Sequence, residues 1–320
     1  MADLSATPVA TAVVAAEVLS RLEDAAWVLA GFERLVRSGA LTASGLTVQT
    51  PEDAAAAQML AAVGLLDGND QARLASGFAE LLSDGSLDTR RHAVVSTLRQ
   101  IATATGIVAR HDAQGWSAQD DATLLAQGKS SALGGTMLAR YAVPSLEGLT
   151  ERFAAGGAFL DVGVGVGELA AAFCDELANA RVVGLDVLPR AIELARHTIA
   201  DRGLQDRLDV RLVPVQDFTD IAQFDLAWMP APFLPREIFR EGLRRVRDAL
   251  RPGAWLVVAS GRFDGDELAV AVTRWKTLCS GGTPLTANEA LTLLHDAGFT
   301  EVKELPTPPG SPALYAARRP

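Results

Sequence analysis

Three glycines at alternate positions directly follow an apolar run near residue 160. The run AGGAFLDV, residues 155–162, is typical of a buried strand. It leads into Gly163, Gly165 and Gly167, and then into the helix-like segment ELAAAFCDELA. Glycine lacks a Cβ, so the backbone can turn sharply there and approach a ligand closely. The free N–H groups at the start of the next helix would point toward that ligand. The pattern predicts a ligand-binding turn between a strand and a helix.

Dinucleotide-binding Rossmann proteins use a similar turn, but they require a third glycine or alanine three positions after the second glycine. Here that position is Glu168. A carboxylate at a helix N-terminus would repel a pyrophosphate lying there. A nicotinamide-linked oxidoreductase therefore stays open only as a remote alternative.

The segment from Asp161 to Gly167 instead resembles the acidic-x-Gly-x-Gly-x-Gly signature of S-adenosylmethionine-dependent methyltransferases with the Rossmann-like fold. This cofactor has no phosphate, and its sulfonium and ammonium groups are both cationic, so acidic surroundings suit it. The resemblance implies that the glycine turn packs against the methionine portion of S-adenosyl-L-methionine. It also implies that Asp161 orients the ammonium group.

A second acidic residue ends the next strand-like run, RVVGLDV. Asp186 stands nineteen residues beyond Gly167, and Val187 follows it. A carboxylate at the tip of the second strand can accept hydrogen bonds from both ribose hydroxyls. The alternative is a cap for the next helix. We favour the ribose role because Leu188-Pro189 places the start of that helix slightly later.

Two further strand-like runs carry candidate residues to the same edge. The run LDVRLVPV leads into Gln216, Asp217 and Phe218. In methyltransferases of this shape an acidic residue here accepts the adenine amino group and its neighbour covers the ring, and Asp217 and Phe218 have those types. The alternative is a turn cap and a core residue. The run FDLAWMP delivers Trp228 and Met229 to the carboxyl edge of the sheet, where ligands of open α/β sheets bind.

No histidine or other general base occurs in the run from Trp228 to Pro235, at the end of this fourth strand. Winged-helix O-methyltransferases generally keep a catalytic His there, commonly followed by Asp-Trp, whereas residues 228–235 read WMPAPFLP. The Asn-Pro-Pro-aromatic signature of amide and base N-methyltransferases is missing too. A base is needed only when the acceptor is a hydroxyl that must be deprotonated, since methyl transfer is dominated by positioning and exclusion of water.

Three explanations for the missing base stay open. The acceptor is a nitrogen or carbon nucleophile that needs little help, or a base comes from another segment, or the domain binds the cofactor without turnover and acts as an interaction or regulatory module. The catalytic residue is therefore unassigned, with His111, Tyr141 and Asp264 as candidates for a base. Candidate walls of the acceptor site are Tyr141, Trp228, Phe233 and Trp275.

Short apolar runs alternate with helical patterns from residue 159 onward, which predicts a parallel sheet built from βαβ units. After Thr286 come the helix-like ANEALTLLHDAGF and the strands EVKEL and ALYAARR. A helix and a closing antiparallel hairpin are what the methyltransferase family adds. We expect an α/β fold in which residues 151–320 form a seven-stranded Rossmann-like methyltransferase sheet that binds S-adenosylmethionine.

Residues 1–150 have a mostly helical texture. Apolar residues recur at helical spacing between Leu19 and Phe32, and a second helix begins at Pro51 with Thr50 as its N-cap. The order of elements over about residues 20–90 resembles the winged-helix N-terminal domain of bacterial small-molecule O-methyltransferases, which implies a dimerisation and substrate-lid role. An unspecified helical domain stays open, and acidic charge argues against a helix-turn-helix that reads DNA.

Composition limits the remaining classes. The chain has 320 residues, which suits two domains. Residues 1–150 contain 10 Lys and Arg against 16 Asp and Glu, and the rest contain 19 against 23, so neither half offers the basic face of a nucleic-acid binder.

Cysteine and histidine usage and the N-terminal sequence narrow the classes further. Two distant cysteines and four scattered histidines predict neither a disulfide nor a metal site. The apolar N-terminal stretch is interrupted by Glu17 and predicts neither a signal peptide nor a membrane span. We expect a cytoplasmic homodimer that methylates a small lipophilic or aromatic molecule at N, C or O, chiefly by positioning, without nucleic-acid or membrane partners.

Overall fold

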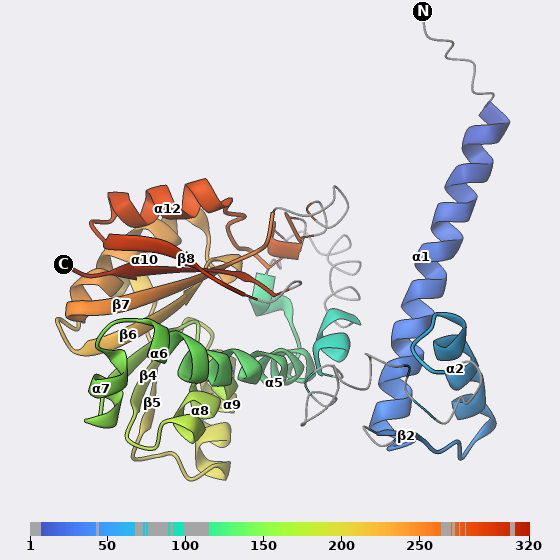
Figure 1. The fold of residues 1–320 in the computed structure, drawn as a ribbon, viewed down its shortest axis with the longest axis horizontal. Coiled ribbons are helices and arrows are strands. Elements are labelled where there is room, and N and C mark those ends of the chain that lie inside the picture. Colours follow the sequence, from blue (N-terminus) through green and yellow to red (C-terminus); the bar gives the residue numbers. More distant parts are fainter. Residues whose placement is uncertain are drawn as a thin grey trace, which may run out of the picture. The chain divides into compact units, whose positions relative to one another are not determined.

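The protein is described by a computed structural model (Figure 1), and its contacts divide the chain into two compact units, Met1–Leu98 and Arg99–Pro320. The structure describes residues 8–42, 45–67, 73, 75, 89, 92–98, 115–263, 270, 273–274, 276–278, 280–307 and 311–320.

The N-terminal unit contains two helices joined by a small antiparallel hairpin, and residues 92–98 are also helical. The second helix begins at Pro51, and the Thr50 side chain accepts a hydrogen bond of 3.1 Å from the Asp53 N–H, so the predicted N-cap is confirmed. The segment LASGFAELLSDG, residues 74–85, has a helix-like sequence, and apart from residue 75 it lies outside the described residues. The described elements are α1 (Pro8–Arg37), β1 (Leu41–Thr42), β2 (Gly45–Leu46) and α2 (Pro51–Ala62).

The second unit contains a seven-stranded sheet in the order β5-β4-β3-β6-β7-β9-β8. The first five of these run parallel, whereas β9 is antiparallel to β7 and β8 is antiparallel to β9. The predicted α/β sheet with its closing hairpin is confirmed. Its strands are β3 (Ala158–Val162), β4 (Arg181–Asp186), β5 (Leu208–Leu212), β6 (Phe224–Pro230), β7 (Leu250–Ser260), β8 (Thr300–Leu305) and β9 (Ala313–Arg318).

Helices cover both faces of this sheet, and successive apolar residues of its central strands alternate between two cores. Leu226 of β6 packs into the core beneath α8 and α9, whereas Ala227 packs into the core beneath α10 and α12. The predicted tail helix begins after Thr286, whose side chain forms a capping box with Glu289. The four helices are α8 (Glu168–Glu176), α9 (Pro189–Asp201), α10 (Arg236–Ala249) and α12 (Ala287–Asp296).

The segment before the sheet belongs to the same compact unit, although the change of sequence texture falls near residue 150. A long helix in this segment packs along α8, and the shorter helices after it share the core of α8 and β3. The division between the units at Leu98 therefore precedes the boundary that the sequence indicates. The elements are α5 (Asp121–Met137), the π-helical turn Leu138–Ala142, α6 (Val143–Ser145) and α7 (Leu149–Ala154).

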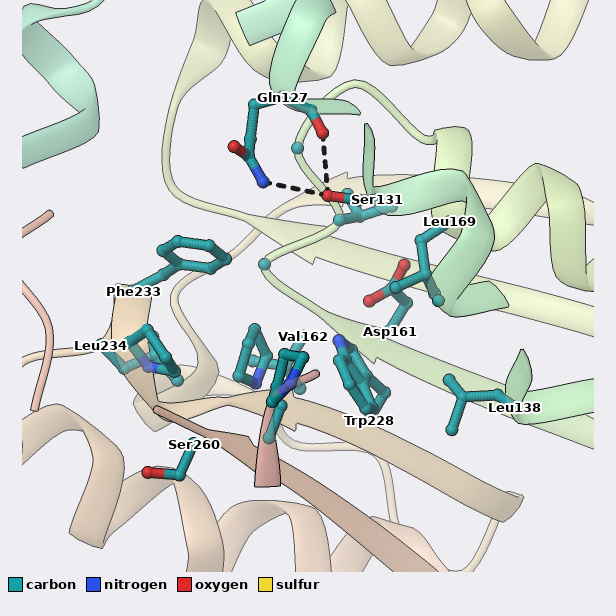
Figure 2. Close-up of a pocket in the computed structure, with 18 of the residues that line it drawn as sticks. Gln127, Ser131, Leu138, Asp161, Val162, Leu169, Trp228, Phe233, Leu234 and Ser260 are labelled. Carbon is teal, nitrogen blue, oxygen red and sulfur yellow. Dashed lines mark hydrogen bonds between the residues drawn. The ribbon is translucent and has the colours of Figure 1, made fainter. Parts of the chain in front are cut away.

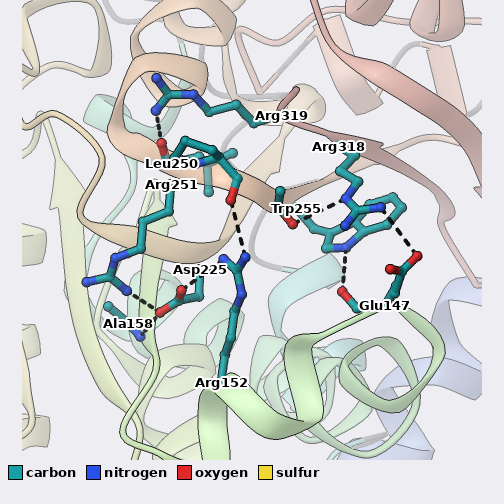
Figure 3. Close-up of polar contacts among 11 residues, drawn as sticks. Glu147, Arg152, Ala158, Asp225, Leu250, Arg251, Trp255, Arg318 and Arg319 are labelled. Atoms are coloured by element: carbon teal, nitrogen blue, oxygen red, sulfur yellow. Dashed lines mark hydrogen bonds and ion pairs between the residues drawn. The ribbon is translucent and has the colours of Figure 1, made fainter.

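A buried carboxylate fastens α7 to the amino edge of the sheet (Figure 3). Asp225 of β6 accepts hydrogen bonds from Arg152 of α7 at 3.1 Å, from Arg251 at 2.5 Å and from the Ala158 N–H at 2.9 Å. Three donors on one carboxylate satisfy most of its acceptor capacity, which makes its burial tolerable. The helices that follow α5 are thereby fixed relative to the strands.

Two adjacent glycines provide a test of how closely α5 packs on α8. A Cβ on Gly135 would lie 2.1 Å from the backbone oxygen of Leu169, whereas a Cβ on Gly134 would lie 3.3 Å from the end of the Leu169 side chain. We expect Gly135→Ala to lower the free energy of unfolding by about 1–3 kcal/mol through overpacking. Gly134→Ala should be neutral or stabilise by up to about 1 kcal/mol through helix propensity. Urea unfolding followed by circular dichroism measures both, and equal effects would contradict the close packing.

Candidate functional site

A large pocket opens at the carboxyl ends of β3, β4 and β6 (Figure 2). Its volume is about 1340 Å³ and its lining is mainly apolar. Small-molecule sites generally occupy roughly 300–1,000 Å³, so this pocket has room for two small molecules side by side. The sheet edge forms one side, and α5 contributes another.

The glycine turn after β3 forms part of the pocket wall. Gly163 and Gly165 line it with φ of +75° and +55°, a backbone conformation that side chains disfavour. A Cβ on Gly165 would meet no atom within 4 Å, so this part of the backbone faces open space. Gly167 lies outside the lining, where it caps α8 and faces Ala195 of α9. The turn thus presents bare backbone to the pocket, as the sequence predicts.

Asp186, at the end of β4, holds this turn in place. One carboxylate oxygen accepts a hydrogen bond of 2.8 Å from the Gly165 N–H, and the other accepts bonds from Val187 and Leu188. Asp186 and Val187 also line the pocket, so both residues are placed where they could contact a ribose, as predicted. Asp186 also acts in part as the helix cap that was the alternative prediction. Its carboxylate accepts hydrogen bonds from the N–H groups of Val187 and Leu188, just before α9 begins at Pro189.

Asp161, Gln216 and Trp116 each line the pocket with one buried polar atom that has no hydrogen-bond partner among the described residues. The Asp161 side chain is buried, and among the described residues none donates a hydrogen bond to its Oδ2. Burial raises the pKa of Asp161 to about 8, and the nearby negative charge of Asp186 adds to the shift. Burial also raises the pKa of Asp186, although three backbone N–H groups oppose this effect. A cationic ligand would stabilise both carboxylates.

The residues that follow β5 divide differently from the sequence prediction. Gln216 lines the pocket, and its buried Oε1 accepts no hydrogen bond from the described residues. Asp217 is exposed and does not line the pocket, whereas Phe218 is buried in the core with its ring 6.0 Å from that of Phe224. The 3-10 turn Val215–Asp217 therefore turns Gln216, and not its neighbour, toward the site.

Trp228 and Met229 separate because adjacent strand residues point to opposite faces. Trp228 lines the pocket and packs on the same core as α8. Met229 is fully buried on the other face, where a Cβ on Gly242 of α10 would lie 2.7 Å from its methyl group. The structure brings only Trp228 of this pair to the site.

Aromatic and neutral polar groups also line the pocket. The rings of Trp116 and Phe233 meet edge to face at 5.4 Å, and Tyr141 lies at the exposed margin. On α5, Gln127 donates a hydrogen bond of 3.2 Å to Ser131, and both residues line the pocket (Figure 2). No sequence motif marks Trp116, Gln127 or Ser131, so the sequence did not predict them as site residues.

Besides Asp161 and Asp186, the charged side chains of the lining are Glu168 and, on β8, Lys303 and Glu304. Glu168 lines the pocket but forms an ion pair with Arg202 of the α9 C-terminus. His197 and His295 are exposed and lie outside the lining. The candidates His111, Asp264 and Trp275 lie outside the described residues. In the described part of the chain, no three His, Cys, Asp or Glu side chains gather as a metal site would require, and no helix is long and apolar enough to cross a membrane.

Comparisons with known proteins agree with this geometry. Residues 160–256 match a family described as a methyltransferase domain, so this part of the chain is a methyltransferase domain. Among proteins of curated function, none matches the chain in sequence.

Solved structures resemble the whole chain. An O-methyltransferase family protein from Burkholderia thailandensis is 18% identical with a TM-score of 0.67, covering 95% of this chain and 98% of its own. The S-adenosylmethionine-dependent methyltransferase SibL is 22% identical with a TM-score of 0.65, covering 99% and 100%. Human N-acetylserotonin methyltransferase is 13% identical with a TM-score of 0.65, covering 99% of both chains. At these identities the likeness establishes the fold.

The buried Asp161 should destabilise the ligand-free protein as pH rises. Its folded pKa of about 8 exceeds the value of about 3.9 expected in the unfolded chain. Between these values the folded state binds a proton that the unfolded state does not, so stability falls as pH rises.

We therefore expect Asp161→Asn to raise Tm by at least about 2–4 °C at pH 8, the shift that roughly 1 kcal/mol produces at this size, and to change it little at pH 4.5. Scanning calorimetry across this range measures the effect. The exposed Asp201→Asn serves as the control. A Tm difference that does not grow with pH would contradict the raised pKa.

Proposed function

We propose that this methyltransferase domain transfers the methyl group of S-adenosylmethionine to a small, mainly apolar acceptor. The observation that carries the proposal is the meeting of Asp161, Asp186 and the bare backbone of Gly165 in one pocket at the carboxyl edge of the sheet. Asp161 suits the ammonium group of a methionine–ribose ligand and Asp186 suits its ribose. The backbone at Gly165 leaves room for the methionine portion. When bound, the cofactor supplies an activated methyl group on its sulfonium.

The groups of the pocket fit this cofactor. The unpaired Oδ2 of Asp161 would accept the ammonium group, which would return the buried carboxyl to its charged form. Asp186 and Val187 would meet the ribose. The buried Oε1 of Gln216 would accept the adenine amino group, a role for which Asp217 is too exposed. The contacts to Asp161 and Gln216 would each satisfy a buried oxygen that the described residues leave without a donor.

The remaining volume would hold the acceptor between Trp116, Phe233 and α5. Aromatic walls orient a flat molecule, and the cover of α5 keeps water from the reacting atoms. Leu234 and Pro235 line the pocket just after the 3-10 turn Ala231–Phe233, which follows β6. Neither side chain can remove a proton, and no described histidine lines the pocket. Transfer then depends on holding the acceptor atom in line with the methyl group.

The proposal includes a cytoplasmic homodimer that associates through residues 10–90. The side chains of Leu22, Trp27 and Leu29 on α1 are exposed within the N-terminal unit. A second copy of the chain would cover such apolar surface.

Calorimetry with S-adenosylhomocysteine tests the cofactor assignment. We expect binding of this compound and none of NAD. Gln216→Ala should weaken binding about 2- to 10-fold, the effect of losing one hydrogen bond, whereas Asp217→Ala should leave affinity unchanged. Binding of NAD without binding of S-adenosylhomocysteine would overturn the proposal. An effect of Asp217→Ala alone would reassign the adenine contact to that side chain.

Turnover tests the absence of a general base. With a panel of flat phenols and aromatic amines as acceptors, we expect formation of S-adenosylhomocysteine at a rate that follows the ionisation of the acceptor. Tyr141→Phe and His111→Ala should each lower kcat less than the roughly 100-fold expected on loss of a base. A thousandfold loss with cofactor affinity intact would indicate base-assisted O-methylation. Cofactor binding without turnover of any acceptor would favour an interaction or regulatory module.

A further inference from the structure

Trp228 lies next to the carboxylate assigned to the ammonium group. In the parallel pairing of β3 with β6, Trp228 is the direct partner of Asp161. Partners in register point to the same face of a sheet and lie about 4.7–4.9 Å apart. Both side chains line the pocket, and Figure 2 shows the Trp228 ring beside the Asp161 carboxyl.

The ring of Trp228 has no cation of its own in the described part of the chain, in contrast to Trp255 on the neighbouring strand. Trp255 carries Lys303 at 5.0 Å and Arg318 at 5.6 Å from its ring centroid. Trp228 lines the pocket on the same face of the sheet as Trp255 but nearer its carboxyl edge, where it is half-buried. Its aromatic surface is therefore open to a cationic ligand.

The spacing of the two side chains matches the spacing of two charges on the cofactor. In a methionine chain about 4–5 Å separates the ammonium nitrogen from the sulfonium sulfur, the reach of four single bonds. A ligand that places its ammonium group on Asp161 thus brings its sulfonium to the neighbouring strand. Aromatic rings attract cations that lie within about 6 Å of the ring centroid.

On the basis of the proposed function, we propose that the Trp228 ring binds the sulfonium by a cation–π interaction and makes the site prefer the methyl donor to its demethylated product. S-adenosylhomocysteine has the same ammonium, ribose and adenine groups, so Asp161, Asp186 and Gln216 treat both ligands alike. Its thioether is neutral and gains nothing from the ring quadrupole. Trp228 would therefore favour product release after each transfer.

Calorimetry with both ligands tests this role. Trp228→Leu should weaken S-adenosylmethionine binding about 3- to 30-fold, the range of cation–π energies, and change S-adenosylhomocysteine affinity less than about 2-fold. Trp228→Phe should retain part of the preference because phenylalanine is a weaker cation binder. Ile221→Leu, at an exposed position outside the pocket lining, should change neither affinity.

A second measurement guards against a folding defect in the Trp228 variants. Replacing tryptophan biosynthetically by mono- and difluorotryptophan weakens the ring quadrupole with little change of shape, and should lower affinity for S-adenosylmethionine stepwise while affinity for S-adenosylhomocysteine stays constant. Equal losses for both ligands, or no loss for either, would overturn the role of Trp228. Failure of both ligands to bind the wild-type chain would instead refute the proposed function.

Discussion

The burial of two carboxylates at neighbouring strand ends is the constraint that organises this site. Asp186 receives hydrogen bonds from the N–H groups of Gly165, Val187 and Leu188, which partly offset the loss of water. Asp161 keeps one oxygen with no donor among the described residues, so its charge is costly and its pKa rises to about 8. An arginine in the core would have relieved this cost, as Arg152 and Arg251 do for Asp225. In the pocket a cationic ligand would offset the cost of charging Asp161, so the site favours cations independently of the acceptor.

The backbone around these carboxylates explains why few side chains fill the pocket next to them. Val164 of the glycine turn packs over β4, where a Cβ on Gly184 would lie 2.5 Å from a methyl group of Val164. The turn therefore rests directly on the neighbouring strand, within reach of Asp186. The alternation of β6 then brings Trp228 to the pocket and turns Met229 into the opposite core. Sheet pairing, turn geometry and side-chain alternation together determine which atoms a ligand would meet.

Local patterns were sufficient to predict the elements of the sheet domain from the sequence. The run FDLAWMP coincides with β6, and Thr286 caps the helix that its spacing predicts. The sequence did not predict that Gln216 lines the pocket and Asp217 does not, because this depends on how the 3-10 turn Val215–Asp217 packs against α10. The sequence also did not predict that α5 forms a wall of the pocket. Its role follows from tertiary packing through Gly135 on α8, and its sequence resembles that of any small-residue helix.

The pocket lining combines charged and uncharged groups, and this bears on how a reaction without a base would proceed. Asp161 and Asp186 lie at the ends of β3 and β4, whereas Trp116, Phe233 and the α5 residues of the lining are uncharged. In the proposed complex the two carboxylates would attract the cationic methionine portion, and the apolar surfaces would contact the acceptor. The start of α5 is held to α9 by Asp121, which accepts a hydrogen bond of 2.8 Å from Arg190. A helix fixed at both ends would limit the approach of the acceptor to one direction, so alignment would replace proton removal as the main contribution to the rate.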